Sequence, residues 1–125
     1  MAGSAAARVQ SLEEIYGLVR TAVVSRRSIS VTYEGGRRWL CLHVLGHNTL
    51  GQHRVFCYQY GGDSKSGLQP KRGVGSWRCI ALDKLSHVEL LDDAWRTEPH
   101  ARQRCVEHVE FDAEHQPGGE PQNGQ

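Results

Sequence analysis

The stretch Ile29–Leu45, which reads ISVTYEGGRRWLCLHVL, decides the fold of this 125-residue chain. Apolar and polar residues alternate from Ile29 to Tyr33, and their β-branched and aromatic types favour a strand. Glu34-Gly35-Gly36 then supplies glycines that tolerate the positive φ of a tight turn. Arg37–Leu45 is the returning strand, so the whole stretch predicts a β-hairpin.

A helix is predicted immediately before this hairpin, over Ser11–Ala22. Ser11 and Glu14 have the spacing of a capping box, in which each side chain binds an exposed amide at the helix start. Apolar residues then recur at helical spacing and form one stripe: Leu12, Ile15, Tyr16, Val19, Ala22 and Val23. We expect the sheet to cover this stripe.

Three further strands are predicted after the hairpin, at Arg54–Tyr60, Trp77–Ala81 and His87–Leu91. The intervening segment Gly61–Ser76 is rich in glycine and carries several basic residues, which predicts a long, mobile, basic loop. One helix and five short strands predict an α+β fold, mainly β, in which a small, strongly bent β-barrel is plugged by its N-terminal helix.

The charges are divided unevenly along the chain, although the formal net charge is only +1. Residues 1–91 hold 12 Lys and Arg against 6 Asp and Glu, whereas residues 92–125 hold 3 against 8. The first part therefore favours anionic partners. Residues 96–125 combine acidic residues with proline and glycine, and we expect a disordered acidic tail; one extra strand at Cys105–Phe111 is the alternative.

Several classes of protein are excluded by what the sequence lacks. Its longest apolar runs are a few residues, so we expect no membrane span, which needs roughly 20. Met1–Arg8 lacks the basic segment and apolar core of a secretory signal, and residues 1–10 are expected to be flexible. Without such a signal, Cys41, Cys57, Cys79 and Cys105 are expected as free thiols, in the cytoplasm.

Four motifs follow one another in a recognisable order along the chain. They read RRSISVTYEG at Arg26–Gly35, RWLCLHVLG at Arg38–Gly46, RVFCYQ at Arg54–Gln59 and WRCIALDKL at Trp77–Leu85. This series resembles the WYL domain family in a stand-alone form, over roughly Leu12–Trp95, with His53-Arg54-Val55 in place of the Trp-Tyr-Leu triplet. The resemblance implies a domain at residues 11–95 with an Sm-like, five-stranded barrel. It also implies a ligand sensor of the kind common in bacterial transcriptional regulators and defence-linked proteins.

Polar and aromatic residues on the predicted strands form the candidate ligand site. They are Tyr33, Arg38, His43, Arg54, Tyr58, Gln59 and Arg78. A guanidinium binds phosphate or carboxylate with two parallel hydrogen bonds, and Tyr and His add stacking surfaces. Arg54 and Arg78 are the stronger candidates because each stands among apolar neighbours, where an unpaired charge is costly. The alternative is that all seven are ordinary solvated or half-buried strand residues.

The predicted function is regulatory ligand sensing, with a nucleotide or short single-stranded nucleic acid as the ligand and transcription or a partner protein as the target. The alternative is a protein–protein interaction adaptor without a small-molecule ligand. Such an adaptor would pair with itself or with a regulator, and its acidic tail would compete for the basic face. No cofactor is expected.

Metal binding and catalysis find little support in the sequence. Cys41-x-His43 and Cys105-x-x-His108 are about sixty residues apart, whereas zinc pairs sit in a tight frame, so no metal site is expected. Cys57 with His43 or His53 could form a thiol–imidazole pair, but no oxyanion-hole motif accompanies it, and the chain is not expected to be an enzyme. Cys57 and Cys79 are expected to be small buried apolar residues.

Overall fold

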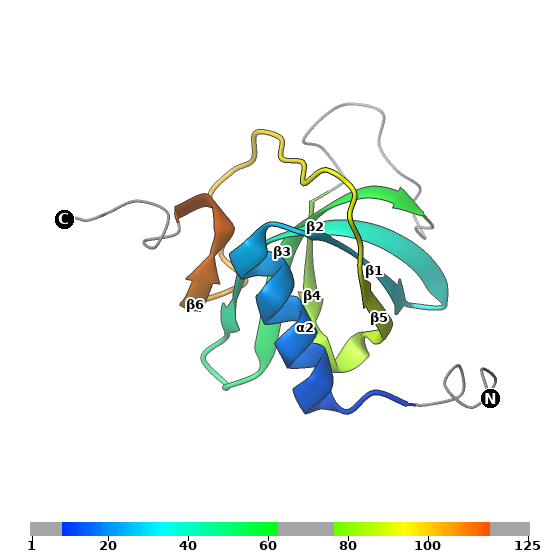
Figure 1. Ribbon diagram of the computed structural model, residues 1–125. Helices are drawn as coiled ribbons and strands as arrows, with labels where there is room; N and C mark the ends of the chain where they lie inside the picture. Colours follow the sequence, from blue (N-terminus) through cyan, green and yellow to red (C-terminus); the bar gives the residue numbers. More distant parts are fainter. Residues whose placement is uncertain (1–8, 63–76, 116–125) are drawn as a thin grey trace, which may run out of the picture.

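The computed structural model describes residues 9–62 and 77–115 and shows one helix packed on an antiparallel sheet (Figure 1). The fold is therefore α+β and mainly β, as predicted. The elements are α2 (Leu12–Ser25), β1 (Ser28–Tyr33), β2 (Gly36–His47), β3 (His53–Gly62), β4 (Trp77–Ala81), η1 (Leu82–Lys84), β5 (Ser86–Leu90), β6 (His108–Asp112) and η2 (Ala113–His115). Both η1 and η2 are short 3₁₀-helices. The predicted basic loop at 61–76 lies mostly outside the described residues.

Helix α2 begins and ends where local chemistry dictates. The Ser11 hydroxyl accepts from the Glu14 amide and the Glu14 carboxylate accepts from the Ser11 amide, which confirms the capping box. Arg26 closes the helix in the left-handed region at φ 52°. Ile15, Val19 and two residues of the last turn are buried against the sheet, whereas Leu12 is 52% exposed. The apolar stripe is thus confirmed from Ile15 onward.

The β1–β2 hairpin is tight because its two turn residues both have positive φ. Tyr33 pairs with Gly36, and the residues between them, Glu34 and Gly35, have φ values of 52° and 78°. This backbone matches the right-handed twist of the flanking strands. The predicted hairpin is confirmed, with β2 continuing two residues beyond the expected end.

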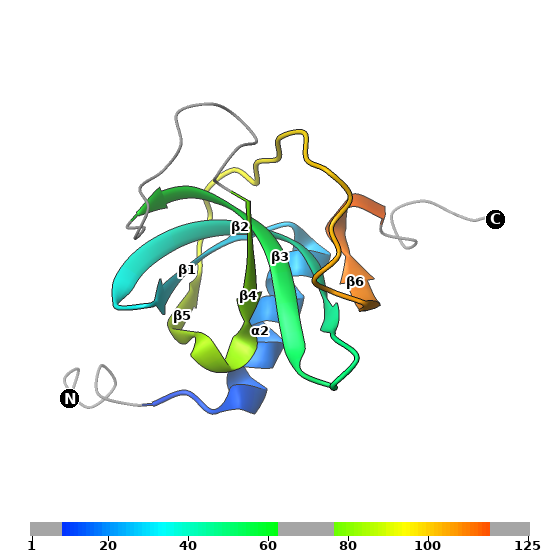
Figure 2. The same ribbon diagram turned by 180° about the vertical axis from the view of Figure 1, so that it is seen from behind.

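Strand β2 has neighbours along both edges. Its first half pairs with β1 and its last four residues pair with β6 on the same edge, while β3 follows its other edge. The strand order is β4-β3-β2-β1-β5, and β6 lies off this path, paired with β2. In the described residues β4 and β5 are edge strands that do not pair with each other, so the sheet does not close into the barrel we expected. η1 joins these two strands (Figure 2). Its Leu82 is buried and belongs to the core between the sheet and α2.

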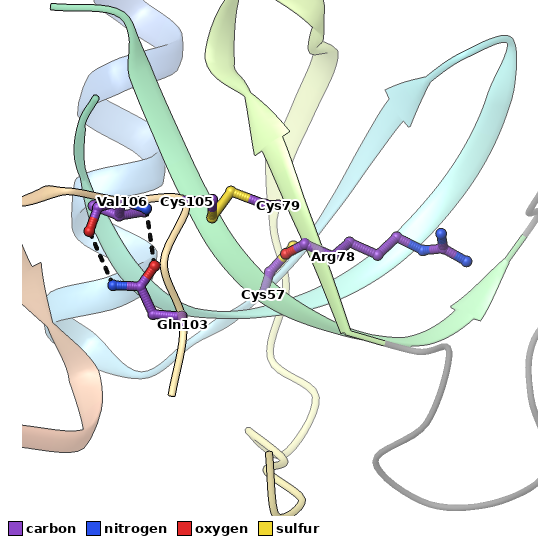
Figure 3. The surroundings of a disulfide bond; sticks show 6 residues. All are labelled: Cys57, Arg78, Cys79, Gln103, Cys105 and Val106. Atoms are coloured by element: carbon purple, nitrogen blue, oxygen red, sulfur yellow. Dashed lines mark hydrogen bonds between the residues drawn. A yellow bond between two sulfur atoms is a disulfide. The ribbon is translucent and has the colours of Figure 1, made fainter. Parts of the chain in front are cut away.

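The segment after β5 is ordered, contrary to our expectation for residues 96–125. Val106 is 2% exposed, and Gln103 holds its backbone through hydrogen bonds of 2.9 and 3.0 Å (Figure 3). β6 then forms where the alternative strand was considered. Residues 116–125 lie outside the described part. Near the other end, Gln10 makes two hydrogen bonds with the backbone of Val88, so the expected flexibility of residues 1–10 is wrong for Gln10.

A disulfide joins Cys79 of β4 to Cys105, just before β6 (Figure 3). The expectation of four free thiols is therefore wrong for this pair, and Cys79 is not a simple apolar core residue. Sequence spacing alone does not reveal which cysteines meet in space. Cys41 and Cys57 are free and buried.

No helix in the described residues is long and apolar enough to span a membrane.

Removal of the disulfide should destabilise the chain substantially. The two cysteines are 26 residues apart in the sequence. A crosslink that closes a loop of this length stabilises a fold by about 3 kcal/mol, because it lowers the conformational entropy of the unfolded chain. We expect the variant C79A/C105A to lose about that much free energy of unfolding in urea titrations. Reductant should destabilise the wild-type chain similarly and leave the variant unchanged. Equal stability of the two chains in oxidising buffer would contradict the expectation.

Candidate functional site

Four of the seven predicted site residues lie together at one end of the sheet. Tyr33 comes from β1, Arg38 from β2, Gln59 from β3 and Arg78 from β4. The carboxamide of Gln59 is the centre of the group, since its Oε1 accepts from Arg78 Nε at 2.7 Å and from Arg38 Nη1 at 3.3 Å. We call these four residues the arginine cluster.

The orientation of the Gln59 side chain is fixed by its own hydrogen bond. Its Nε2 donates to the carbonyl of Gly61 at 3.0 Å, which leaves Oε1 directed at the two guanidinium groups. Gln59 itself is 1% exposed. One neutral acceptor therefore holds two cations close together, although like charges repel.

Arg38 is the buried member of the arginine cluster, with 2% exposure. Its Nε donates to the Tyr33 carbonyl at 3.2 Å, its guanidinium lies 4.9 Å from the centre of the Tyr33 ring, and its Nη2 is 3.5 Å from a Glu34 carboxylate oxygen. Burial and the Glu34 charge raise the pKa of Tyr33, so its phenol is neutral near pH 7. The Glu34 side chain is 41% exposed. Among the described residues, it is the one carboxylate within ion-pair distance of Arg38.

Arg78 is partly exposed and points away from the disulfide at its neighbour Cys79 (Figure 3). It follows Trp77, where β4 starts directly after residues 63–76. That segment carries Lys65, Lys71 and Arg72 against a single acidic residue, Asp63.

Arg54 does not belong to the arginine cluster, contrary to our expectation. It lines a separate pocket of about 450 Å³ with Tyr33, His53, Asp83 and other residues between β3 and η1. Its Nε is buried and has no hydrogen-bond partner among the described residues. Tyr33 is the one member of the arginine cluster that also lines this pocket.

His43 and Tyr58 are also separate from the arginine cluster, because they pack against the ring of Trp77 at 4.7 and 5.1 Å. His43 is fully buried, and its ring lies 4.3 Å from that of Trp95. Its Nδ1 is 2.9 Å from the Cys41 carbonyl, and its Nε2 is 3.7 Å from Glu114 Oε2. These residues form an aromatic group instead of a ligand-facing sheet surface.

The aromatic group includes residues that we expected to lie in a disordered tail. His100 lies 4.4 Å from the Trp77 ring and 2.8 Å, through Nε2, from Glu114 Oε2. A pocket of about 690 Å³ borders it, lined by Arg26, Trp95, Thr97, Glu98, Pro99, His100 and Glu114. Trp95 was the one sequence signal for this packing, since a large aromatic residue needs a surface to cover.

The zinc ligand pairs considered from the sequence do not form. Cys105 is held in the disulfide, and Cys41 Sγ accepts a hydrogen bond from the Arg96 amide at 3.1 Å. Burial raises the pKa of Cys41 more than this hydrogen bond lowers it. One other group of three potential metal ligands exists among the described residues: His47, His53 and Glu110.

Cys57 is not suited to act as a nucleophile. It is fully buried, its Sγ lies 3.7 Å from the Arg78 carbonyl, and burial raises the pKa of the thiol to about 12. A thiolate is the reactive form of cysteine, and this surrounding disfavours it. The structure therefore places Cys57 in the apolar core, as predicted.

Compared with models of protein families, with curated proteins and with solved structures, the chain matches none of them.

The free thiols should be unreactive in the folded chain. Both Cys41 and Cys57 are fully buried and have raised pKa values, so a thiol-specific chromogenic reagent should react with them only slowly under native conditions. In denaturant without reductant, the two free cysteines should give two thiols per chain. Four thiols would contradict the disulfide, and rapid native labelling would contradict the burial.

His43 should make the fold sensitive to acid. Burial lowers its pKa in the folded chain, so the unfolded state binds more protons below about pH 6.5 and the free energy of unfolding falls. His43→Phe keeps a ring beside Trp77 and cannot titrate. Chemical denaturation between pH 7 and 5 should therefore show a weaker pH dependence for this variant than for the wild-type chain.

His100 provides the matched control because its pKa shifts the other way. Burial lowers it, but the Ala101 carbonyl and the Glu114 carboxylate together raise it above the usual value. This stabilisation is present below the unfolded pKa and is lost as the pH rises through the folded one. His100→Gln should thus steepen the loss of stability in acid. If the pH dependence of His43→Phe equals that of the wild-type chain, buried His43 is not the cause of the sensitivity to acid.

Proposed function

We propose that this chain is a stand-alone, WYL-like ligand-sensing domain that binds an anionic ligand, a nucleotide or a short single strand of nucleic acid, at the arginine cluster. The observation that carries the proposal is the convergence of Arg38 and Arg78 on Gln59 Oε1. Two guanidinium groups from different strands meet there beside one partly exposed carboxylate, Glu34. A phosphate brought to this place would meet two guanidinium groups at once.

The two arginines divide the work of recognition. Arg38 is buried and held by Tyr33 and Gln59, so it supplies a fixed positive charge at low dielectric, where electrostatic attraction is strong. Arg78 is partly exposed and presents a planar fork that suits phosphate oxygens. The order imposed by Gln59 reduces the entropy lost when a ligand binds.

The architecture is compatible with this proposal. A capped helix leads into a bent antiparallel sheet in which β1 to β3 are sequential neighbours, and η1 carries the chain from one sheet edge to the other. We propose that this arrangement is an open version of the Sm-like barrel that the resemblance implies. Binding would then act on transcription through a partner protein.

The contacts of the acidic residues in β6 and η2 bear on the adaptor alternative. In that alternative the acidic C-terminal part competes for the basic face, but two acidic residues of this part, one in β6 and one in η2, contact other groups. Glu110 binds Tyr16 and His47, and Glu114 binds His100. The arginine cluster is therefore not covered by β6 or η2.

The proposal is tested with the full chain and a fluorescently labelled oligothymidylate of about ten nucleotides. Affinity should fall steeply as salt rises from about 50 to 200 mM, because phosphate neutralisation releases counterions. Arg78→Gln should weaken binding by about tenfold or more, the loss of one or two charge-assisted hydrogen bonds. Arg102→Gln removes the same charge from an exposed position and should change affinity little.

A second variant changes the charge of the arginine cluster while keeping its size. Gln59→Glu retains an acceptor for both guanidinium groups but neutralises one of the two cations, so binding of the oligonucleotide and of single nucleotides should be largely lost. Circular dichroism checks that the variant is folded. If neither oligonucleotides nor nucleotides bind the wild-type chain, or if Arg78→Gln binds like wild type, the proposed function is wrong.

A further inference from the structure

Three side chains with metal-ligating atoms meet at the end of the sheet where β2, β3 and β6 come together. His47 is the last residue of β2 and His53 the first of β3, and the two are cross-strand partners. Glu110 lies in β6, whose pairing with β2 brings His108 opposite His47. Nothing in the proposed function uses these residues.

The distances between the three side chains fit a shared ion. His47 Nδ1 is 2.8 Å and His53 Nε2 is 3.3 Å from Glu110 Oε2, and all three ligand atoms lie within 4.8 Å of one another. Two ligand atoms about 2.0–2.1 Å from one metal ion are separated by about 2.9–3.4 Å in octahedral or tetrahedral geometry. The two distances to Glu110 are therefore close to those of a shared ion, and the two histidine nitrogens lie within 4.8 Å of each other.

Neighbouring groups already orient these ligands. The Tyr16 hydroxyl donates to the other carboxylate oxygen, Glu110 Oε1, at 2.6 Å, so Oε2 is left facing the histidines. The Tyr16 ring also meets the His53 ring at 4.9 Å, and His108 stacks on His47 with an interplanar angle of 22°. Such outer contacts are typical of metal sites, where they fix the direction of each ligand.

We propose that His47, His53 and Glu110 bind a divalent first-row transition ion of the Zn²⁺ class. Two imidazole nitrogens and one carboxylate oxygen suit such ions and do not suit Mg²⁺ or Ca²⁺, which prefer oxygen ligands. The side chains of the three ligands are 36%, 39% and 25% exposed, so an ion there keeps coordination positions for water or for another ligand. This proposal replaces our expectation of a chain without a metal site.

A bound ion would fasten β6 to the β2–β3 hairpin. β6 pairs with only the last four residues of β2, and its chain is tied to β4 through the disulfide at Cys105. The ion would add a second attachment within β6 itself, through Glu110. Binding to the folded state alone should therefore raise the melting temperature.

The experiment uses the full chain with its disulfide intact, stripped with a chelator and titrated with ZnCl₂ by calorimetry. We expect one Zn²⁺ per chain, and His47→Ala, His53→Ala and Glu110→Gln should each weaken binding by more than about tenfold. Tyr16→Phe should weaken it less, because Tyr16 positions Glu110 and does not touch the ion. Zn²⁺ should raise the melting temperature of the wild-type chain and not that of His53→Ala.

Two other histidine variants serve as matched controls. His87→Asn removes an exposed imidazole from β5 and suits the positive φ of that position, and His100→Gln removes one from the aromatic group. Both should bind Zn²⁺ like the wild-type chain. If a ligand variant fails to fold, Ni²⁺ added to the wild-type chain should broaden the imidazole resonances of His47 and His53 before those of His87 and His100.

The alternative is that Glu110 only accepts hydrogen bonds from the two histidines. In that case the wild-type chain takes up no Zn²⁺ at micromolar concentration, or the control variants lose as much affinity as the ligand variants, and either outcome overturns the proposal. Oligonucleotide binding depends on the arginine cluster and should be unaffected by His53→Ala, so a failure of either proposal is distinguishable from a failure of the other.

Discussion

The hydrogen bonds that β2 makes with three other strands are the constraint on which the rest of the molecule depends. This strand has 12 residues and neighbours on both edges, and its pairing with β3 shifts register twice, after Trp39 and after Leu42. These irregularities bend the strand around the core, since bulges increase local twist. As a result, side chains of this one strand reach three different groups: Arg38 near its start, His43 in the middle and His47 at its end.

The uneven distribution of charge along the chain is reflected in the partners that the charged side chains have in the structure. Two acidic residues that follow β5 lie within hydrogen-bond distance of histidines: Glu110 of His47 at the end of β2, and Glu114 of His100. Arg38 and Arg78 share the neutral carboxamide of Gln59 as an acceptor, and Arg38 also lies 3.5 Å from the Glu34 carboxylate. Neither Glu110 nor Glu114 contacts Arg38 or Arg78, whereas Asp92 does pair with a cation of the first part, Arg27, at 3.2 Å.

Local signals in the sequence were sufficient for the helix and the hairpin, because the capping box and the turn at Glu34-Gly35 act within a few residues. They were sufficient for part of the candidate site, since Arg38, Gln59 and Arg78 face the same way. His43 was misplaced because it is the extra residue where Leu42 pairs with Cys57 and Val44 pairs with Phe56, and a bulge breaks simple alternation. The Cys79–Cys105 crosslink depends on distant segments that spacing does not reveal. The WYL resemblance and the ligand stay predictions.

The disulfide also changes what a break in the chain would do. Residues 91–104 run between β5 and Cys105 without helix or strand, and many of them are exposed, which makes this connection the natural place for a protease to cut. A cut there would not release β6, because Cys105 keeps the fragment covalently attached to β4 and the ladder with β2 keeps it in register. The disulfide therefore closes residues 79–105 into a covalent loop. As a result, β6 stays in place even when the backbone leading to it is cut.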